Sequence, residues 1–289
     1  MRRVDYLAGS CAGRSGGAIW AYTQEPVGEL VRLWRERRRR SQLDMALAAG
    51  VSARHVSFIE TGRANPSRDM IERLCDELDV PLRERNTLYL SAGFAPMYTE
   101  RPLADLGVAR AAVDAVLQGH EPHPAMAINV RWDLLATNQA MQAIFSDLDE
   151  KFLEPPVNVL RAMLHPEGMA QRVRNYTQWR AATLRRVRRQ LERSAAAGLD
   201  EILEELESYP APSTHAEIGS VPVNDLVMPV VLMTDHGDLS LHHVLTVFGA
   251  PRDVTLDEIA IETFFPADEH SAKLLHMLTS GPAPGAMSV

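Results

Sequence analysis

The stretch from Gln42 to Glu60 concentrates side chains that can hydrogen-bond to nucleic acid. Arg54 carries a planar fork of donors that matches the two acceptors on a guanine edge, and Ser57 can bond to a base edge or a phosphate. Gln42 can place its amide, together with the N-terminus of the helix that it opens, against a phosphate. The chemistry that these residues offer is recognition of double-stranded DNA.

Two short helices that cross steeply at a tight turn would position these side chains. Ala46 is small enough for a close crossing, and Gly50, four residues later, can take the positive φ of the turn. Val56 and Ile59, six and nine residues after Gly50, are predicted to form the apolar side of the second helix. The spacing predicts a helix-turn-helix whose recognition helix covers residues 52–60.

The recognition helix and the segment after it contain the predicted DNA contacts. Ala53 or Phe58 could touch a thymine methyl group, and the polar residues after the helix could hold the backbone. The full set is Gln42, Ser52, Ala53, Arg54, Ser57, Phe58, Arg63, Asn65 and Arg68. For any one of them, a solvated surface residue is the alternative interpretation.

The helices around the motif predict an all-α domain. Arg35 of the first helix and Glu60 at the end of the third are predicted to form a structural pair. The arginines from Arg37 to Arg40 could steer the domain toward DNA or complement the dipole of a solvated helix end. Five helices are expected, at residues 27–40, 42–49, 52–60, 67–78 and 82–92.

Length and composition favour a globular protein of two domains. The chain has 289 residues, of which 46% are hydrophobic, and a formal net charge of −8. No apolar run is long enough for a transmembrane helix, and the N-terminus lacks a signal-peptide pattern. Cys11 and Cys75 form neither a metal-binding spacing nor a disulfide framework. We therefore expect a cytoplasmic protein with no membrane partner.

The charge is distributed unevenly along the chain. Residues 1–90 contain 15 basic and 12 acidic residues, whereas residues 91–289 contain 15 basic and 26 acidic ones. Because salt screens charges beyond a Debye length, the local charge of the helix-turn-helix matters more for DNA binding than the acidic total. The acidic total therefore does not exclude a DNA-binding protein.

The chain beyond residue 93 has mixed periodicity, which predicts an α+β domain with an antiparallel sheet. Helices are expected at residues 106–119, 138–145, 160–164, 169–193 and 199–209 and from about 268. Strands are expected at residues 125–130, 132–137, 226–234, 239–248 and 257–265.

A small-molecule pocket in this second domain should be apolar with a few convergent polar groups. Asn158 and Arg161 lie three residues apart on one helix face, and an Arg with an Asn or His could bind a carboxylate. His165 precedes a turn with proline, and Asn175 shares a helix face with Trp179. These five residues are the predicted ligand-binding set. The alternatives are a helix cap for Asn158, a local backbone partner for His165 and core packing for Trp179.

Catalysis and metal binding are not expected. The sequence has no nucleophile elbow, no Gly-rich phosphate loop and no helical His pair at metal-binding spacing. His243 alternates with leucines on a predicted strand and is interpreted as a core histidine. We expect neither an enzyme nor a bound cofactor or metal.

Longer stretches of the sequence resemble a known family. Residues 27–92 resemble the Xre/Cro-repressor-like helix-turn-helix family. Four segments are similar to the MmyB-like transcription regulators: SARHVSFIETGRANPSRDMIERL, VPLRERNTLYLSAGFAP, LEPPVNVLRAMLHPEG and IETFFPAD. The resemblance covers about residues 27–275. It implies a PAS-like ligand-binding domain after the DNA-binding domain, and a fatty-acid-like effector.

The expected organisation is a flexible leader (1–25), a five-helix repressor-like DNA-binding domain (26–93), a linker (94–104), a PAS-like domain (105–280) and a tail (281–289). The expected function is sequence-specific transcription regulation controlled by the effector. The alternative is a constitutive dimeric repressor whose C-terminal domain is purely structural. The expected partners are double-stranded DNA, a small-molecule effector and a second copy of the chain, because helix-turn-helix proteins usually read two half-sites.

Overall fold

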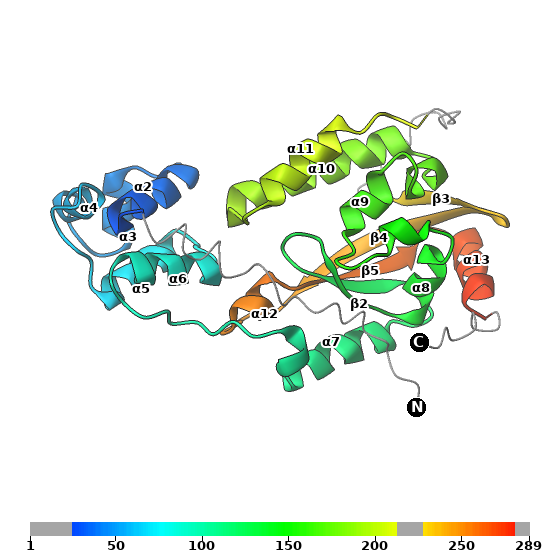
Figure 1. The fold of residues 1–289 in the computed structure, drawn as a ribbon, viewed down its shortest axis with the longest axis horizontal. Helices are drawn as coiled ribbons and strands as arrows, with labels where there is room; N and C mark the ends of the chain where they lie inside the picture. The colour runs from blue at the N-terminus through cyan, green and yellow to red at the C-terminus, as the bar shows by residue number, and fades with distance from the viewer. Residues whose placement is uncertain (1–24, 213–227, 281–289) are drawn as a thin grey trace.

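The computed structural model describes residues 25–212 and 228–280 and has two parts (Figure 1). A helical part lies at one end of the long axis, and a part built on a five-stranded sheet forms the rest. The predicted tail and, apart from residue 25, the predicted leader lie outside the described residues. None of the described helices is long and apolar enough to cross a membrane.

The helical part contains the five predicted helices, although the first ends at Arg37 rather than at residue 40, because Arg39 takes a positive φ of 53°. Ser41, Ser52 and Ser67 each start a helix, because the side-chain oxygen accepts a hydrogen bond from the backbone N–H three residues later. Gly50 and Gly62 turn the chain with φ of 66° and 70°. The helices are α2 (Val27–Arg37), α3 (Gln42–Ala48), α4 (Ala53–Glu60), α5 (Arg68–Glu77) and α6 (Leu82–Ser91).

Helices α2 and α4 cross at a glycine. Gly28 lies in the first turn of α2, and a Cβ atom there would be 2.2 Å from the carbonyl oxygen of Ile59. Ile59 is fully buried together with Met45 and Val56, and Ala46 beside them is 1% exposed. The core of the helix-turn-helix is therefore formed by the residues whose spacing predicts it.

The second part is an α+β domain with an antiparallel sheet in the order β2-β1-β5-β4-β3. Its strands are β1 (Ala125–Ile128), β2 (Leu134–Thr137), β3 (Val230–Thr234), β4 (Gly237–Val247) and β5 (Ala260–Pro266). Its helices are η1 (Leu103–Asp105), α7 (Val108–Gly119), α8 (Gln139–Phe145), η2 (Glu150–Phe152), α9 (Val159–Leu164), η3 (Met169–Arg172), α10 (Tyr176–Ser194), α11 (Leu199–Ser208), α12 (Val254–Glu258) and α13 (Glu269–Ser280). The predicted fold class is confirmed.

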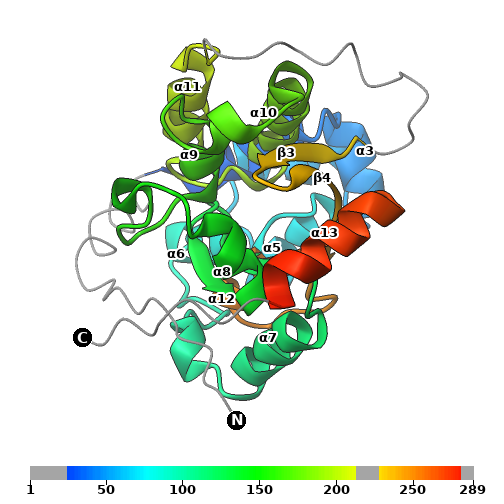
Figure 2. The same ribbon diagram turned by 90° about the vertical axis from the view of Figure 1, so that its right-hand side faces the viewer.

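Strand β1 shows how the two faces of the sheet differ. Met126 and Ile128 belong to a large core shared with α8, α9, α10 and α11, whereas Ala125 and Ala127 belong to a smaller cluster with α7. Neighbouring residues of a strand point to opposite faces. Helices α9, α10 and α11 therefore cover one face, and α7 covers the other (Figures 1 and 2).

The prediction of a single helix at residues 169–193 is wrong at the N-terminal end. Residues 169–172 form the 3-10 helix η3, and α10 begins only at Tyr176. Between them the side chain of Asn175 donates to the carbonyl of Pro229 (2.8 Å) and accepts from the N–H of Val231 (3.1 Å). The backbone N–H of Arg174 donates to the carbonyl of Val231 (2.8 Å). These bonds to β3 hold the segment out of a helix.

The strand predicted at residues 257–265 is also wrong at its start. Residues Val254–Glu258 form the short helix α12, whose first turn is capped by the Asp253 carboxylate through the N–H of Thr255 (3.0 Å). Strand β5 therefore begins at Ala260.

The crossing of α2 and α4 can be tested with Gly28→Ala. The added Cβ atom meets backbone, which cannot turn aside, so we expect a loss of about 2 to 3 kcal/mol in the free energy of unfolding. Gly119→Ala is the matched control, because a Cβ atom added at that helical glycine would meet nothing within 4 Å and its φ is not positive. Urea denaturation of both variants measures the difference, and equal stabilities would contradict the close crossing.

Candidate DNA interface and ligand cavity

Helix α4 presents an exposed arginine on its first turn. Val56 and Ile59 face the core, whereas Arg54 is exposed and has no hydrogen-bond partner within residues 25–212 and 228–280. The Cζ atom of Arg54 lies 5.1 Å from the centre of the Phe58 ring, and that of Arg63 lies 5.9 Å from the same ring. Stacking on Phe58 orients the Arg54 guanidinium while leaving its N–H groups available for a base.

A buried carboxylate fixes the helices that carry this surface. Glu60 accepts from Nε and Nη2 of Arg35, at 2.6 and 2.9 Å, and from the amide of Gln42, at 2.8 Å. Arg35 also donates to the carbonyl of Arg40 (2.9 Å). The hydrogen bond to Glu60 raises the pKa of Arg35. This network joins α2, α3 and α4 and contains the predicted pair of Arg35 and Glu60.

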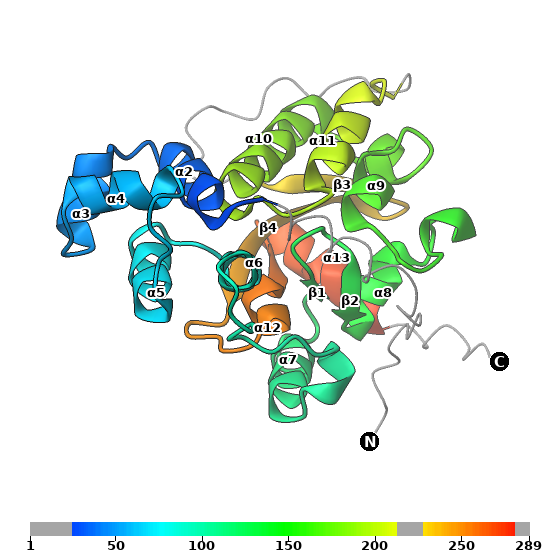
Figure 3. The same cartoon turned by 60° about the vertical axis from the view of Figure 1, so that its left-hand side comes forward.

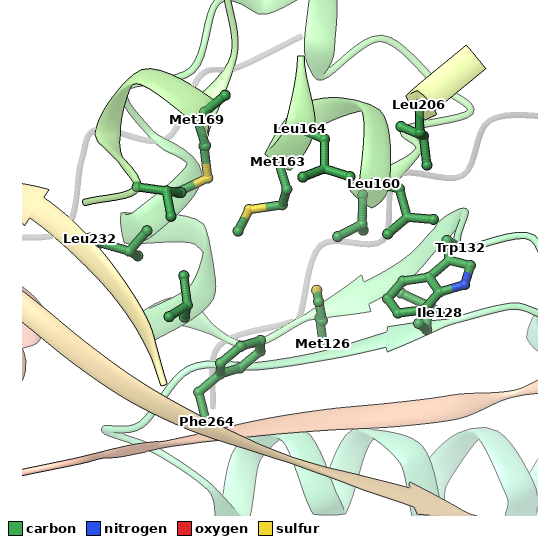
Figure 4. Close-up of a cluster of buried hydrophobic side chains, with 14 of the residues drawn as sticks. Met126, Ile128, Trp132, Leu160, Met163, Leu164, Met169, Leu206, Leu232 and Phe264 are labelled. Atoms are coloured by element: carbon green, nitrogen blue, oxygen red, sulfur yellow. The ribbon is translucent and has the colours of Figure 1, made fainter. Parts of the chain in front are cut away.

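A small cavity lies between the sheet and helices α8, α9 and α10 of the second domain (Figure 4). Its volume is about 50 Å³ and its lining is mainly apolar. Met126 of β1 and Met163 of α9 point toward each other across it. Met141, Met169 and the rings of two tryptophans complete much of the wall. Because methionine side chains are flexible, this wall can adapt to an occupant.

One end of the cavity is polar. Arg186 of α10 binds the carboxylate of Glu262, which is 3% exposed, and donates from Nη1 to Nε2 of His243 (3.1 Å). Its Cζ atom lies 4.5 Å from the centre of the Trp132 ring. A guanidinium can only donate, so Nε2 of His243 is an acceptor and the ring is neutral. Burial lowers the pKa of His243, in agreement with that state.

Comparison with family models identifies both parts of the chain. Residues 26–88 match a helix-turn-helix domain. Residues 109–278, more than half of the chain, match the ligand binding domain of MmyB-like transcription regulators. The chain belongs to this family. Neither match is to an enzyme family, and no curated protein matches the chain.

The predicted DNA contacts of this MmyB-like regulator lie in two environments. Ala53, Arg54, Ser57, Phe58 and Arg63 lie on or directly after α4 and are at least partly exposed. The others are held by their own domain: Gln42 by Glu60, Ser52 as the cap of α4, Asn65 by the carbonyl of Ala92 (3.2 Å), and Arg68 by the rings of Tyr89 and Phe94. Contact of each with DNA stays a prediction.

Only Trp179 of the predicted ligand-binding set lines the cavity. Asn158 is buried as the cap of α9 and donates to the carbonyl of Arg131 (2.8 Å). Arg161 turns instead to α11, where it pairs with Glu205 (2.6 Å). The expected carboxylate clamp of Asn158 and Arg161 is therefore not assembled at the cavity.

The other two members of that set also lie outside the cavity lining. His165 accepts from the N–H of Glu167 (3.1 Å), and its ring packs against Phe152 and Tyr209. Asn175 joins the start of α10 to β3, as described above. Both side chains bind groups of the protein.

The polar end contains residues that were not predicted. His243 lines the cavity next to Arg186, and Thr183 and Glu262 lie at the same wall. Helical spacing could have predicted two of these residues, because Thr183 and Arg186 follow Trp179 by four and seven residues and so lie on one face of α10. Glu262 gave no such signal, since its partner lies 76 residues away in the sequence.

Arg54→Gln tests the predicted base contact. We expect the variant to lose about 1 to 3 kcal/mol of preference for promoter DNA over a scrambled duplex, with unchanged thermal stability, because the side chain is exposed. Fluorescence anisotropy with the two duplexes measures the preference. Lys273→Gln, an exposed change on α13, is the control. If Arg54→Gln and Lys273→Gln prefer promoter DNA over the scrambled duplex to the same extent, Arg54 does not read a base.

The burial of His243 predicts a pH dependence of stability. Its pKa is lowered in the folded chain, so the unfolded chain binds more protons and stability falls as the pH drops below about 6.5. His243→Gln should flatten the profile of melting temperature between pH 7.5 and 5.5 relative to wild type. Burial raises the pKa of Glu84 to about 7, which changes stability with pH in the opposite direction in both proteins. The measured quantity is therefore the difference in melting temperature between wild type and His243→Gln at each pH. Parallel profiles would contradict the prediction.

Proposed function

We propose that this regulator, of the Xre/Cro-repressor-like type, reads operator DNA through α4 and changes its DNA affinity when a fatty-acid-like effector occupies the cavity. The observation that carries the proposal is a methionine-rich apolar cavity with a single arginine at its polar end. We propose that it acts in the cytoplasm. It would act there as a homodimer whose two heads read two half-sites.

The body of the cavity suits an alkyl chain. Burying such a chain against the methionine and leucine side chains contributes about 25 cal/mol for each Å² of apolar surface removed from water. A cavity of about 50 Å³ holds only a few water-sized groups, so the effector enters by turning the methionine side chains. The effector would therefore bind a conformation of the cavity in which the methionine side chains have moved.

The polar end suits one small head group. Two nitrogens of Arg186 already bind His243 and Glu262, and the Thr183 hydroxyl adds a further donor and acceptor. A carboxyl head would use the remaining N–H groups of Arg186. Glu262 already neutralises the positive charge of Arg186. Comparing a fatty acid with an uncharged alcohol of the same chain length therefore shows how much of the binding depends on the carboxylate.

The signal would reach DNA through α10. Trp179, Thr183 and Arg186 of this helix line the cavity, and its last carbonyls accept hydrogen bonds from α2 of the DNA-binding domain. An effector that binds two positions of α10 with different affinity shifts the population between them. The orientation of the DNA-binding domain shifts with it.

Titration of the full chain with decanoic acid and with decanol tests the effector class. Trp132 and Trp179 in the wall should give a saturable change in fluorescence, and native mass spectrometry should count one molecule per chain. The double variant Arg186→Gln/Glu262→Gln removes both charges together, so neither is left buried alone. It should weaken decanoate binding about tenfold or more and leave decanol binding within about twofold.

The same titration repeated with promoter DNA measures the coupling. A change in DNA affinity on adding decanoate supports effector control. If neither compound binds while DNA binding persists, the chain is a constitutive repressor with a structural C-terminal domain, and the effector proposal is wrong.

A further inference from the structure

The outer side of α10 carries a row of three arginines. Arg185, Arg189 and Arg193 follow one another at intervals of four residues, so they lie along one side of the helix. All three are exposed, and this side is opposite to the one where Leu184 and Val187 enter the core. With a rise of about 1.5 Å per residue, the row is about 12 Å long. We refer to Arg185, Arg189 and Arg193 as the α10 ridge.

No described residue forms an ion pair with the α10 ridge. None of its three guanidinium groups has an ion pair or hydrogen bond in the part of the chain that the structure describes. The other arginines of α10 do: Arg180 binds carbonyls of α11, Arg186 binds Glu262 and Arg188 binds Glu207. The ridge therefore carries free positive charge on a domain whose sequence is acidic overall.

The ridge is continuous with the DNA-binding domain. Its C-terminal end meets α2, because Arg37 donates to the carbonyl of Leu191 (2.9 Å) and Arg38 donates to the carbonyl of Arg193 (3.0 Å) (Figures 1 and 3). The exposed Arg39 follows directly and lies three residues before Gln42, the first residue of α3. Positive charge thus extends from the start of the helix-turn-helix along α10.

Two carboxylates near this surface reduce the charge without cancelling it. Glu192 lies on α10 within one turn of two ridge arginines, and Glu36 lies on α2. Glu36 is already paired with Arg32 and Arg35. Helix α10 as a whole contains six arginines and one glutamate, so its outer side stays cationic.

We propose that the α10 ridge binds the phosphate backbone of DNA next to the site read by α4. A row of about 12 Å spans about three nucleotides of one strand, and arginine suits phosphate because its N–H groups form a planar fork. The contact is independent of base sequence and adds affinity and salt dependence to the recognition by α4. The inference rests on the proposed DNA-binding function and assigns part of that function to the ligand-binding domain.

The test compares two charge-matched double variants of the full chain. Arg185→Gln/Arg189→Gln removes two ridge charges, and Lys151→Gln/Lys273→Gln removes two charges from exposed ion pairs on η2 and α13. Binding to a 30-base-pair duplex from the promoter region and to one of unrelated sequence is measured by anisotropy from 50 to 300 mM salt. The ridge variant should bind both duplexes roughly tenfold more weakly at 100 mM salt, with a slope of log affinity against log salt reduced by about 1.8. The control should stay within about twofold of wild type.

The outcomes separate the two proposals. If wild type binds neither duplex, the proposed DNA-binding function fails. If wild type binds and the ridge variant matches the control in affinity and salt slope, the ridge proposal is overturned while DNA binding stands. If the ridge variant keeps its DNA affinity but changes mass in light scattering, the ridge contacts protein instead, which also overturns the proposal. Circular dichroism checks that both variants are folded.

Discussion

Arginine side chains bound to the carbonyl ends of helices hold the two domains of this regulator together. Arg37 donates to Leu191 at the end of α10, and Arg38 donates both to Leu78 at the end of α5 (2.6 Å) and to Arg193 (3.0 Å). The last carbonyls of a helix carry partial negative charge, and each carbonyl oxygen has two lone pairs, so that of Leu191 accepts from Arg37 as well as from the N–H of Ala195 (3.0 Å). A guanidinium brings positive charge and N–H donors to these carbonyls, and its bonds help to set where the DNA-binding domain sits.

A second contact limits rotation about the first. Helix α6 begins after Pro81, which provides no side-chain cap, and the N–H of Leu82 donates instead to the Asp257 carboxylate of α12 (2.9 Å). Next to it, Arg83 binds Glu258 of the second domain. The start of α6 is thus capped by the other domain. With both contacts in place, a displacement of α10 cannot be absorbed by a loose linker and must move the helix-turn-helix or break a contact.

Helix α10 links the cavity to the DNA-binding domain. One side packs in the core, an adjoining side supplies Trp179 and Arg186 to the cavity, and its C-terminal end holds α2. This arrangement explains why so many of its arginines have different partners: each side of the helix faces a different environment. An occupant of the cavity would press on the helix that also positions the DNA-binding domain, which gives effector control a short physical route.

The sequence by itself determined the DNA-binding domain, because its determinants are local. Serine caps, Gly50 and the spacing of Val56 and Ile59 act within a few residues, and no distant partner is needed to interpret them. The breaks before α10 and β5 were missed because Asn175 and Asp253 form bonds that periodicity does not reveal.

Only the tertiary structure decided the cavity. Arg186 reaches it while Arg161 pairs with Glu205 at the surface, although both are helical arginines near apolar residues. The difference is sheet register: β4 and β5 pair His243 with Phe264 and Leu245 with Glu262, which brings His243 and Glu262 to one face under α10. The contacts of Arg186 with His243 and Glu262 join residues that are 57 and 76 apart in the sequence, so they depend on how α10 packs on the whole sheet and no local spacing encodes them.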